Sequence, residues 1–244
     1  MGVLDVVSRV SELAVRQWGL LTTAQAGAEG ITRLQLARLA AAGVLDRLDR
    51  GVYAVPAAVD ERTPLRVAWL TLDPAQLAEE RLADPMASGV VSHTSAATLH
   101  GVGDLLDDEP ELTVPGRKQS RRGLRLHRAV LDTGDVTIVG GLPVTTPART
   151  AADLLRDGHD PSHVAEIIDE MRRRDLASQG ELVAVLDPLA RRNGQPDGAA
   201  LLESLLTGSG LGLESRPIHP EAEGNTGAMK FPLVLVADSA GGAE

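Results

Sequence analysis

The segment at residues 20–56 constrains the fold more than any other part of the chain, because two helix-start signatures are followed there by two short strand-forming runs. Thr22 with Gln25, and Thr32 with Gln35, have the Thr-x-x-Gln spacing of a capping box. In this motif the hydroxyl accepts a hydrogen bond from the third helical N–H, while the amide side chain bonds back to the cap residue. A short glycine-containing turn between the helices is typical of a helix-turn-helix. The order of these elements predicts a winged helix-turn-helix.

The second of these helices is expected to span residues 32–42 and to bury one face. Leu36 and Leu39 recur at helical spacing on that face, whereas Arg33 and Arg38 lie on the other face beside alanines. Small residues next to guanidinium groups let a helix lie deep in the major groove of DNA, where arginine pairs with both acceptors of guanine. We therefore expect this helix to read duplex DNA. The alternative interpretation is that the unit only packs against the rest of the chain or contacts a protein.

Residues 44–55 are expected to form the wing, a pair of strands with Asp49-Arg50-Gly51 as the turn. Arg47 and Arg50 would then lie on the wing, where cationic side chains contact DNA phosphates.

Composition narrows the class of partner. The chain of 244 residues has no cysteine, which excludes disulfides, thiolate nucleophiles and cysteine-rich zinc modules. It has only two tryptophans, one tyrosine and one phenylalanine, so it offers few platforms for stacking single-stranded bases. The sequence contains no apolar run long enough to span a bilayer. We expect a cytoplasmic protein that binds double-stranded rather than single-stranded nucleic acid and has no membrane partner.

The net charge of −10 argues against DNA binding, but its distribution matters more than its sum. Residues 1–60 hold six arginines and six acidic residues, so the N-terminal part is neutral. A second basic patch lies between Leu112 and Leu131, where no acid occurs. Two interpretations stay open for it: a loop that grips DNA or an acidic partner, or a solvated hairpin turn. The patch consists of Arg117, Lys118, Arg121, Arg122, Arg125 and Arg128.

The fold class expected from the whole chain is α+β. The predicted domains are a winged helix-turn-helix at residues 1–58, a helical connector at 59–87, an α+β domain at 88–206 and a flexible tail at 207–244. In the third segment, a short strand feeds a helix capped near Ser92 or Thr94, and a small sheet precedes a helical C-terminal half. Strands are expected at residues 111–114, 124–128, 136–139 and 142–144, and helices at 147–156, 161–174, 178–192 and 197–206.

Three stretches of sequence resemble the AbiEi-type antitoxins of bacterial type IV toxin-antitoxin systems: GLLTTAQAGAEGITRLQLARLAAAGVLDRLDRGVYAV, VVSHTSAATLHGVGD and LTVPGRKQSRRGLRLHRAVLDTGDVTIVGGLPVTTPARTAADLL. The likeness covers about residues 15–175. It implies a winged helix-turn-helix followed by an α+β antitoxin domain, binding to repeats in the protein's own promoter, autorepression, and neutralisation of a nucleotidyltransferase-like toxin. Besides the cap residue Thr32, the recognition-helix and wing segment to which the resemblance assigns DNA contact holds Arg33, Gln35, Arg38, Arg47, Arg50 and Tyr53.

Alternative functions are a stand-alone transcriptional regulator or a protein-interaction adaptor. In some related proteins the same middle region precedes a nuclease similar to very-short-patch repair endonucleases. Such domains commonly need a lysine two residues after an acidic metal ligand, but Lys118 and Lys230 follow Gly116 and Ala228 at that spacing. A degenerate relative of these endonucleases is therefore the less favoured alternative, and we predict a protein that is not an enzyme.

Neither a metal site nor a cofactor is predicted. His93 and His100 are expected to pack or cap, because no carboxylate and nucleophile elbow accompany them. His159 and His163 have metal-like spacing, but Pro161 starts a helix between them, so their rings should not share a face. The cluster of Thr145, Thr146, Arg149, Thr150 and Asp153 is expected to cap a helix and to form an internal Arg149–Asp153 pair, with a contact to the toxin or to the winged domain as the alternative.

Overall fold

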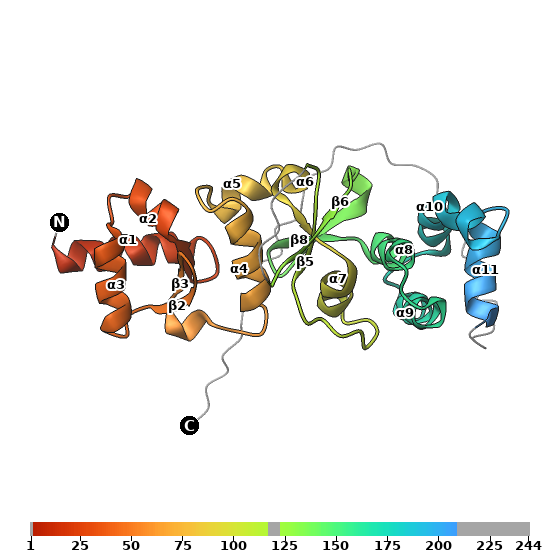
Figure 1. Ribbon diagram of the computed structural model, residues 1–244, viewed down its shortest axis with the longest axis horizontal. Helices are drawn as coiled ribbons and strands as arrows, with labels where there is room; N and C mark the ends of the chain where they lie inside the picture. The colour runs from red at the N-terminus through yellow and green to blue at the C-terminus, as the bar shows by residue number, and fades with distance from the viewer. Residues whose placement is uncertain (1, 117–122, 209–244) are drawn as a thin grey trace, which may run out of the picture. The chain divides into compact units, whose positions relative to one another are not determined.

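The computed structural model describes residues 2–116 and 123–208 (Figure 1). These residues lie within one compact unit at 1–213, so the predicted domain boundary at residue 58 stays a prediction. Most of the predicted flexible tail, from residue 209 onward, lies outside the described residues. Among the described helices, none is long and apolar enough to cross a membrane.

The N-terminal part is a winged helix-turn-helix, as predicted. It contains three helices, α1 (Val3–Val15), α2 (Thr23–Ala28) and α3 (Arg33–Ala41), and the strands β1 (Leu20–Thr22), β2 (Asp46–Asp49) and β3 (Val52–Ala54). The strands form an antiparallel sheet in the order β1-β3-β2. The predicted wing is the β2–β3 pair, whereas β1, which completes the sheet, was not predicted.

Both predicted capping boxes are present and fix where α2 and α3 begin. The Thr22 hydroxyl accepts from the Gln25 N–H at 3.1 Å, and the Gln25 side-chain oxygen accepts from the Thr22 N–H at 2.9 Å. The corresponding distances for Thr32 and Gln35 are 3.3 Å and 2.8 Å. These bonds satisfy N–H groups that have no partner within a helix.

Tyr53 belongs to the core of this N-terminal part. It lies on the central strand β3, and its exposed fraction is 7%, among Val10 of α1, Leu21 of β1 and Leu36 of α3. The sequence prediction that Tyr53 contacts DNA does not agree with this position. Successive side chains of a strand point to opposite faces of the sheet, and the Tyr53 side chain points to the face that packs against these core residues.

A second, five-stranded mixed sheet has the order β6-β5-β4-β8-β7. Its strands are β4 (Val90–Val91), β5 (Glu111–Val114), β6 (Arg125–Arg128), β7 (Val136–Val139) and β8 (Leu142–Thr145). Strand β5 pairs with β6 in parallel. The interpretation of the intervening segment as a hairpin turn is therefore wrong, because a hairpin joins antiparallel strands.

Short helices precede this sheet. They are η1 (Pro56–Ala58), α4 (Thr63–Leu72), α5 (Ala78–Leu82) and α6 (Pro85–Ser88). Among them, α4 and α5 contribute buried side chains to the core of the sheet. The Trp69 side chain of α4 is fully buried in one cluster with Val91, Leu112 and Val144 of the sheet. The segment predicted as a connector therefore supplies part of the hydrophobic core.

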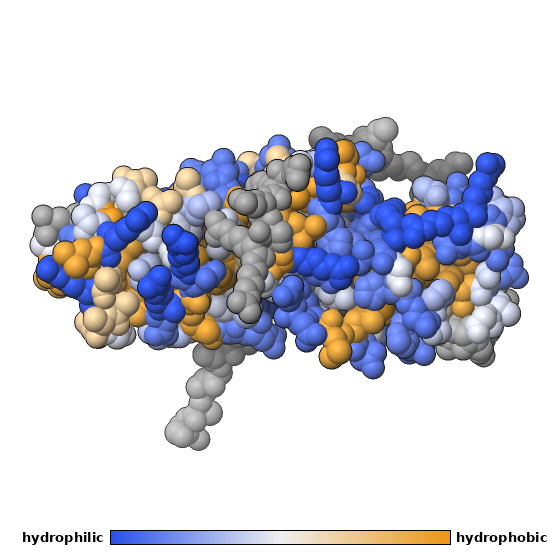
Figure 2. All heavy atoms as spheres, in the orientation of Figure 1, coloured by the Kyte–Doolittle hydropathy of each residue, from blue (hydrophilic) through white to orange (hydrophobic). Residues whose placement is uncertain are grey.

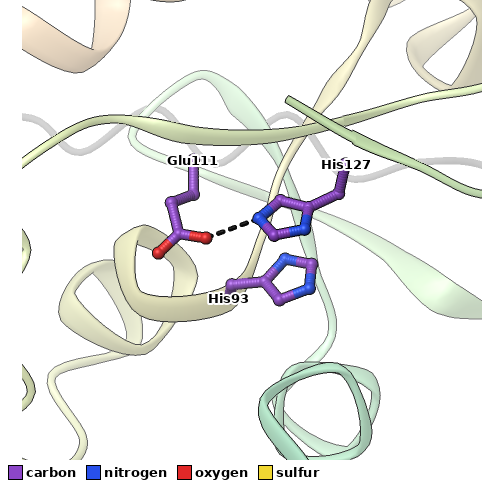
Figure 3. A group of neighbouring side chains, drawn as sticks. All are labelled: His93, Glu111 and His127. Atoms are coloured by element: carbon purple, nitrogen blue, oxygen red, sulfur yellow. Dashed lines mark hydrogen bonds and ion pairs between the residues drawn. The ribbon is translucent and has the colours of Figure 1, made fainter. Parts of the chain in front are cut away.

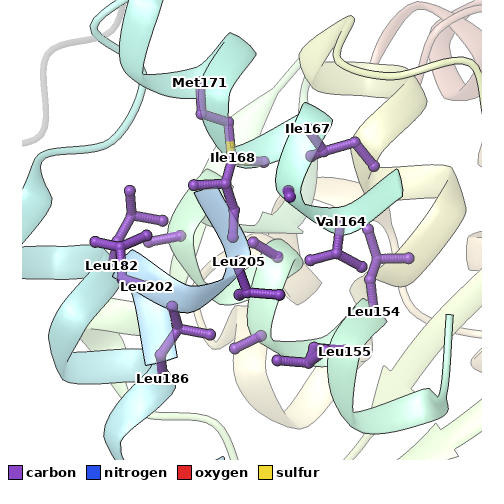
Figure 4. Packing of buried hydrophobic residues seen from close by; sticks show 14 of the residues in the cluster. Leu154, Leu155, Val164, Ile167, Ile168, Met171, Leu182, Leu186, Leu202 and Leu205 are labelled. Atoms are coloured by element: carbon purple, nitrogen blue, oxygen red, sulfur yellow. The ribbon is translucent and has the colours of Figure 1, made fainter. Parts of the chain in front are cut away.

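The C-terminal half is helical, as predicted. Helix α7 (His93–His100) is followed, after the sheet, by α8 (Pro147–Asp157), α9 (Pro161–Arg173), α10 (Gln179–Ala190) and α11 (Gly198–Gly208), with short turns η2 (Thr133–Asp135) and η3 (Arg191–Asn193). Figure 4 shows their shared core of aliphatic side chains, in which Leu154, Ile168 and Leu186 are fully buried. Burial of such side chains stabilises the fold by about 1.5–3 kcal/mol each.

Candidate nucleic-acid interface and a buried histidine cluster

Helix α3 presents its arginines outward. Leu36 and Leu39, at 0% and 6% exposure, anchor the helix to the N-terminal core, whereas Arg33 and Arg38 are exposed. Figure 2 shows hydrophilic and hydrophobic residues side by side over this part of the molecule, at the left of the view. The helix therefore has the amphipathic arrangement that the sequence predicted, with a cationic outer face.

The wing places two further arginines at the surface. Arg47 and Arg50 are both exposed, and the Asp49 carboxylate accepts the backbone N–H of Arg50 at 2.6 Å in the turn. Gly51 follows with φ +83°, a backbone conformation that residues with a side chain rarely adopt. Glycine at this position therefore lets the β2–β3 turn close tightly.

Arg33 and Arg50 line one shallow hollow, although they lie in different elements. The hollow has a volume of about 420 Å³ and is also bordered by Thr23 and Gly27 of α2 and by Gly51. It brings a side chain from the first turn of α3 beside the tip of the wing. The sequence predicted each arginine separately but gave no sign of this shared hollow.

Within residues 2–116 and 123–208, the four arginines of α3 and the wing form no ion pair. None of Arg33, Arg38, Arg47 and Arg50 has a carboxylate of another described residue within 4.0 Å. By contrast, the Arg149 guanidinium contacts both Asp135 at 2.7 Å and Asp153 at 2.9 Å. Uncommitted guanidinium groups are the kind that can neutralise phosphates.

Thr32 and Gln35 serve the helix start. Their side chains are engaged with each other at 2.9 Å and with the backbone N–H groups of the cap. The Thr32 hydroxyl and the Gln35 side-chain oxygen are therefore used within the protein, and the arginines are the stronger candidates for base contact.

The second basic patch is described only at its C-terminal end. Arg117, Lys118, Arg121 and Arg122 lie outside the described residues. Arg125 is paired with Asp157 at 2.7 Å and lies 3.9 Å from Glu111, whereas Arg128 is exposed.

The cluster around Arg149 has the structural role that the sequence favoured. Thr146 caps α8 by accepting the Arg149 N–H at 3.4 Å, and the guanidinium pairs with Asp153 at the predicted i, i+4 spacing. The Thr145 and Thr150 hydroxyls bond to each other at 2.7 Å. The cluster ties α8 to the end of β8.

A group of the buried His93 and Glu111 with the partly buried His127 was not predicted (Figure 3). Glu111 accepts a hydrogen bond from His127 Nε2 at 2.5 Å and another from the Thr94 hydroxyl. The rings of His93 and His127 are stacked, with their centroids 3.4 Å apart. One nitrogen of each ring and one carboxylate oxygen all lie within 4.8 Å of one another.

Three elements hold this group in place. His93 is the first residue of α7, directly after β4, and its φ of +54° lies in the left-handed region. Glu111 is on β5, and His127 is on β6 opposite Thr113. Since side chains two residues apart on a strand share a face, the parallel register turns Glu111 and His127 toward the same side of the sheet.

Burial and hydrogen bonds set the protonation of the group. Burial, assisted by the neighbouring His127, holds the pKa of His93 well below its ordinary value, so this ring is neutral. Burial alone raises the pKa of Glu111, but hydrogen bonds from His127 and Thr94 outweigh it and hold that pKa below its ordinary value. The group therefore contains the Glu111 carboxylate and the neutral His93 imidazole.

The sequence did not reveal this group because its members are 18 and 16 residues apart and follow no metal-binding spacing. The prediction that His93 packs agrees with its 6% exposure. The parallel pairing of β5 with β6 was the missing information, and no local sequence signal encodes it. His100 also packs, with its Nε2 2.7 Å from the Thr145 carbonyl oxygen.

The fold and the outward arginines of α3 define a winged helix-turn-helix regulator joined to an α+β domain. Residues 8–56 match the family model described as a transcriptional regulator, AbiEi antitoxin, and residues 86–204 match the AbiEi antitoxin C-terminal domain. The two models together match well over half of the chain, which belongs to the AbiEi antitoxin family, as the sequence resemblance predicted.

Other comparisons add less. The RV2827C protein from Mycobacterium tuberculosis, a solved structure, is similar to this chain with 21% identity and a TM-score of 0.49, over 82% of this chain and 77% of that one. A comparison with curated proteins gave no match.

Proposed function

We propose that this protein is a sequence-specific double-stranded DNA-binding autorepressor and the antitoxin of a type IV toxin-antitoxin system. It acts in the cytoplasm, is not an enzyme, and binds repeats in its own promoter through α3 and the β2–β3 wing. The observation that carries the proposal is the set of four exposed arginines, Arg33, Arg38, Arg47 and Arg50, which have no acidic partner among the described residues.

The geometry supports a division of labour between these side chains. Arg38 lies between the exposed Ala37 and Ala41, and this low surface allows the helix to approach base edges closely. Arg33 and Arg50 border the same hollow, which suits a backbone phosphate that both guanidinium groups contact. Arg38 is accordingly assigned to base reading, and the other three arginines to phosphates.

A fluorescence-anisotropy titration tests this assignment with a duplex from the region upstream of the gene, at several salt concentrations. An R38A variant should lose about 1–3 kcal/mol of binding to the operator and discriminate less against a scrambled duplex. An R50A variant should lose affinity for both duplexes and reduce the log–log salt slope by about 0.9.

The matched control is the double variant R191A/R192A, because it removes the same charge as R33A/R38A from two exposed arginines of η3. Operator binding should survive in the control and be lost in R33A/R38A. Equal affinities of both double variants would refute the role of α3.

The antitoxin role rests on family membership and needs its own test. Expression of a neighbouring nucleotidyltransferase-like gene should arrest growth, and co-expression of this protein should relieve the arrest. Relief should persist in R33A/R38A when both genes are driven by an unrelated promoter, because neutralisation is assigned to the α+β domain. A growth arrest that this protein does not relieve would contradict the antitoxin role and leave a stand-alone regulator.

A further inference from the structure

We propose that His93, Glu111 and His127 form a binding site for one divalent first-row transition metal ion, with Zn²⁺ as the best match. The three residues come from α7, β5 and β6, so a bound ion would join the edge strand β6 to the interior of the sheet. This site is separate from the arginines of the proposed DNA surface.

The donor atoms have the right chemistry. Imidazole nitrogens and carboxylate oxygens are the ligands with which proteins bind Zn²⁺, and two histidines with one glutamate form a known three-residue set that leaves a fourth position for water. Calcium and magnesium are disfavoured because they prefer sites built wholly from oxygen.

The donor atoms are also close to the required spacing. Ligand atoms around a tetrahedral zinc ion are about 3.3 Å apart, given metal–ligand distances of about 2.0–2.1 Å. Here the three atoms lie within 4.8 Å of one another, and His127 Nε2 and Glu111 Oε2 are separated by 2.5 Å. Side-chain rotation would have to bring the three atoms to the tetrahedral spacing and tilt the two stacked rings, which lie 14° from parallel, until a nitrogen of each points at one ion. The hydrogen bond between Glu111 and His127 would then be replaced by metal bonds.

The backbone at His93 is strained, and packing of the side chain in a hydrophobic core alone would not require this strain. A left-handed conformation is strained at a residue other than glycine, and such strain concentrates at functional sites. His93 adopts this conformation at the junction of β4 and α7. The Ser92 hydroxyl, itself bonded to Thr113 at 2.8 Å, lies 2.9 Å from His93 Nδ1 and fixes the orientation of the ring.

Hydrogen bonds also fix the orientation of the Glu111 carboxylate. The Glu111 side chain is 5% exposed, yet both of its oxygens are engaged, one by Thr94 and the other by His127. Supporting hydrogen bonds of this kind orient metal ligands and tune their affinity. A metal-free network of the same residues is the competing explanation, and it predicts no metal affinity.

The test uses the full chain, stripped with EDTA and titrated with ZnCl₂ against a chromophoric chelator. We expect one tightly bound Zn²⁺ per chain, a rise in Tm on binding, and visible d–d absorption bands typical of four-coordinate cobalt when Co²⁺ replaces Zn²⁺. Absence of both Zn²⁺ binding and the cobalt bands in the wild-type chain would overturn the proposal without reference to any variant.

Conservative variants locate the site. E111Q and H127N should weaken Zn²⁺ binding at least tenfold and lose the cobalt bands, because each removes a metal ligand and leaves a polar side chain in its place. H163A is the matched control, since His163 is exposed in the first turn of α9 and lies outside the cluster.

Circular dichroism establishes that each variant is folded before its metal affinity is compared. If either variant fails to fold, the wild-type cobalt spectrum and the H163A control still decide the question. Binding that persists in folded E111Q and H127N but is lost in H163A would assign the metal to the surface and overturn the proposal.

Discussion

The buried guanidinium of Arg81 is predicted to be a major contributor to stability. Its side chain, at 1% exposure, donates to the Trp69 carbonyl at 2.7 Å and to the Ser88 carbonyl at 2.6 Å, and its Cζ lies 3.6 Å from the centroid of a Trp69 ring. Trp69 is among the last four residues of α4, whose carbonyls lack partners within the helix. Arg81 therefore closes the C-terminal ends of α4 and α6 together.

The magnitude follows from three contributions. Replacing Arg81 by methionine leaves two carbonyls without their donor, at about 2–6 kcal/mol for the pair, and removes a stacking contact of about 2 kcal/mol. The substitution also relieves the cost of burying a charge. Burial lowers the pKa of Arg81 to about 10, well below the ordinary value for arginine. At 1.36 kcal/mol per pKa unit, the difference corresponds to about 3 kcal/mol. The expected net destabilisation is about 3 kcal/mol, or roughly 6–12 °C in Tm for a domain of this size.

Urea denaturation of wild type, R81M and R81K measures the effect. R81K should be at least as destabilised as R81M, because lysine keeps a buried charge but has no planar fork to bridge both carbonyls and stack on Trp69. R173M is the control, since the Arg173 side chain is 68% exposed and its substitution should change stability by less than about 0.5 kcal/mol. An R81M variant as stable as R173M, or an R81K variant close to wild type, would refute this account of Arg81.

Three further substitutions test other parts of the fold by the same assay. T22A should lower the free energy of unfolding more than T32A, whose cap contributes about 1 kcal/mol. The reason is that the Thr22 hydroxyl also donates to the Pro74 carbonyl and is fully buried. Equal losses in the two variants would contradict this. I168A should cost about 2–5 kcal/mol, since Ile168 is fully buried among the C-terminal helices, and a loss below about 1 kcal/mol would mean that the site collapses on truncation. Burial lowers the pKa of His100, so the folded state binds a proton at this ring less readily than the unfolded chain does. Stability present above about pH 6.5 should therefore be lost as the pH falls below that value. H100Q, which keeps a donor for the Thr145 carbonyl, should show a smaller loss of Tm between pH 7.5 and 5.5.

The elements that could be predicted from the sequence are those whose cause is local. Capping boxes at Thr22 and Thr32, and a proline in the first turn of α8 and α9, act within four residues of chain. The helices and the wing were therefore predicted with boundaries close to those observed. The exposed arginines of α3 were also predictable, because helical periodicity decides which face is buried.

The features that escaped prediction depend on pairing between distant segments. Strand β1 consists of Leu20–Thr22, too short for an alternating pattern, and exists because β3 accepts it as a partner. The parallel register of β5 and β6 is likewise set by the whole sheet, and it alone brings Glu111 beside His127. Tyr53 was predicted to contact DNA because it lies in the wing segment, but β3 is the central strand of its sheet, and the Tyr53 side chain is buried in the core.

The net charge of −10 can be reconciled with DNA binding through the way the fold distributes its ion pairs. Arginines of the α+β domain, such as Arg149 and Arg174, form ion pairs with carboxylates of their own helices. Their charge is therefore largely neutralised within the protein. Those of α3 and the wing have none of these partners among the described residues. Since charges further apart than a Debye length of about 10 Å are screened at 0.1 M salt, the distant acids weaken long-range attraction but act little on contacts at the interface. We therefore expect the salt slope of operator binding to follow the number of phosphate contacts made by α3 and the wing, and not the net charge of the chain.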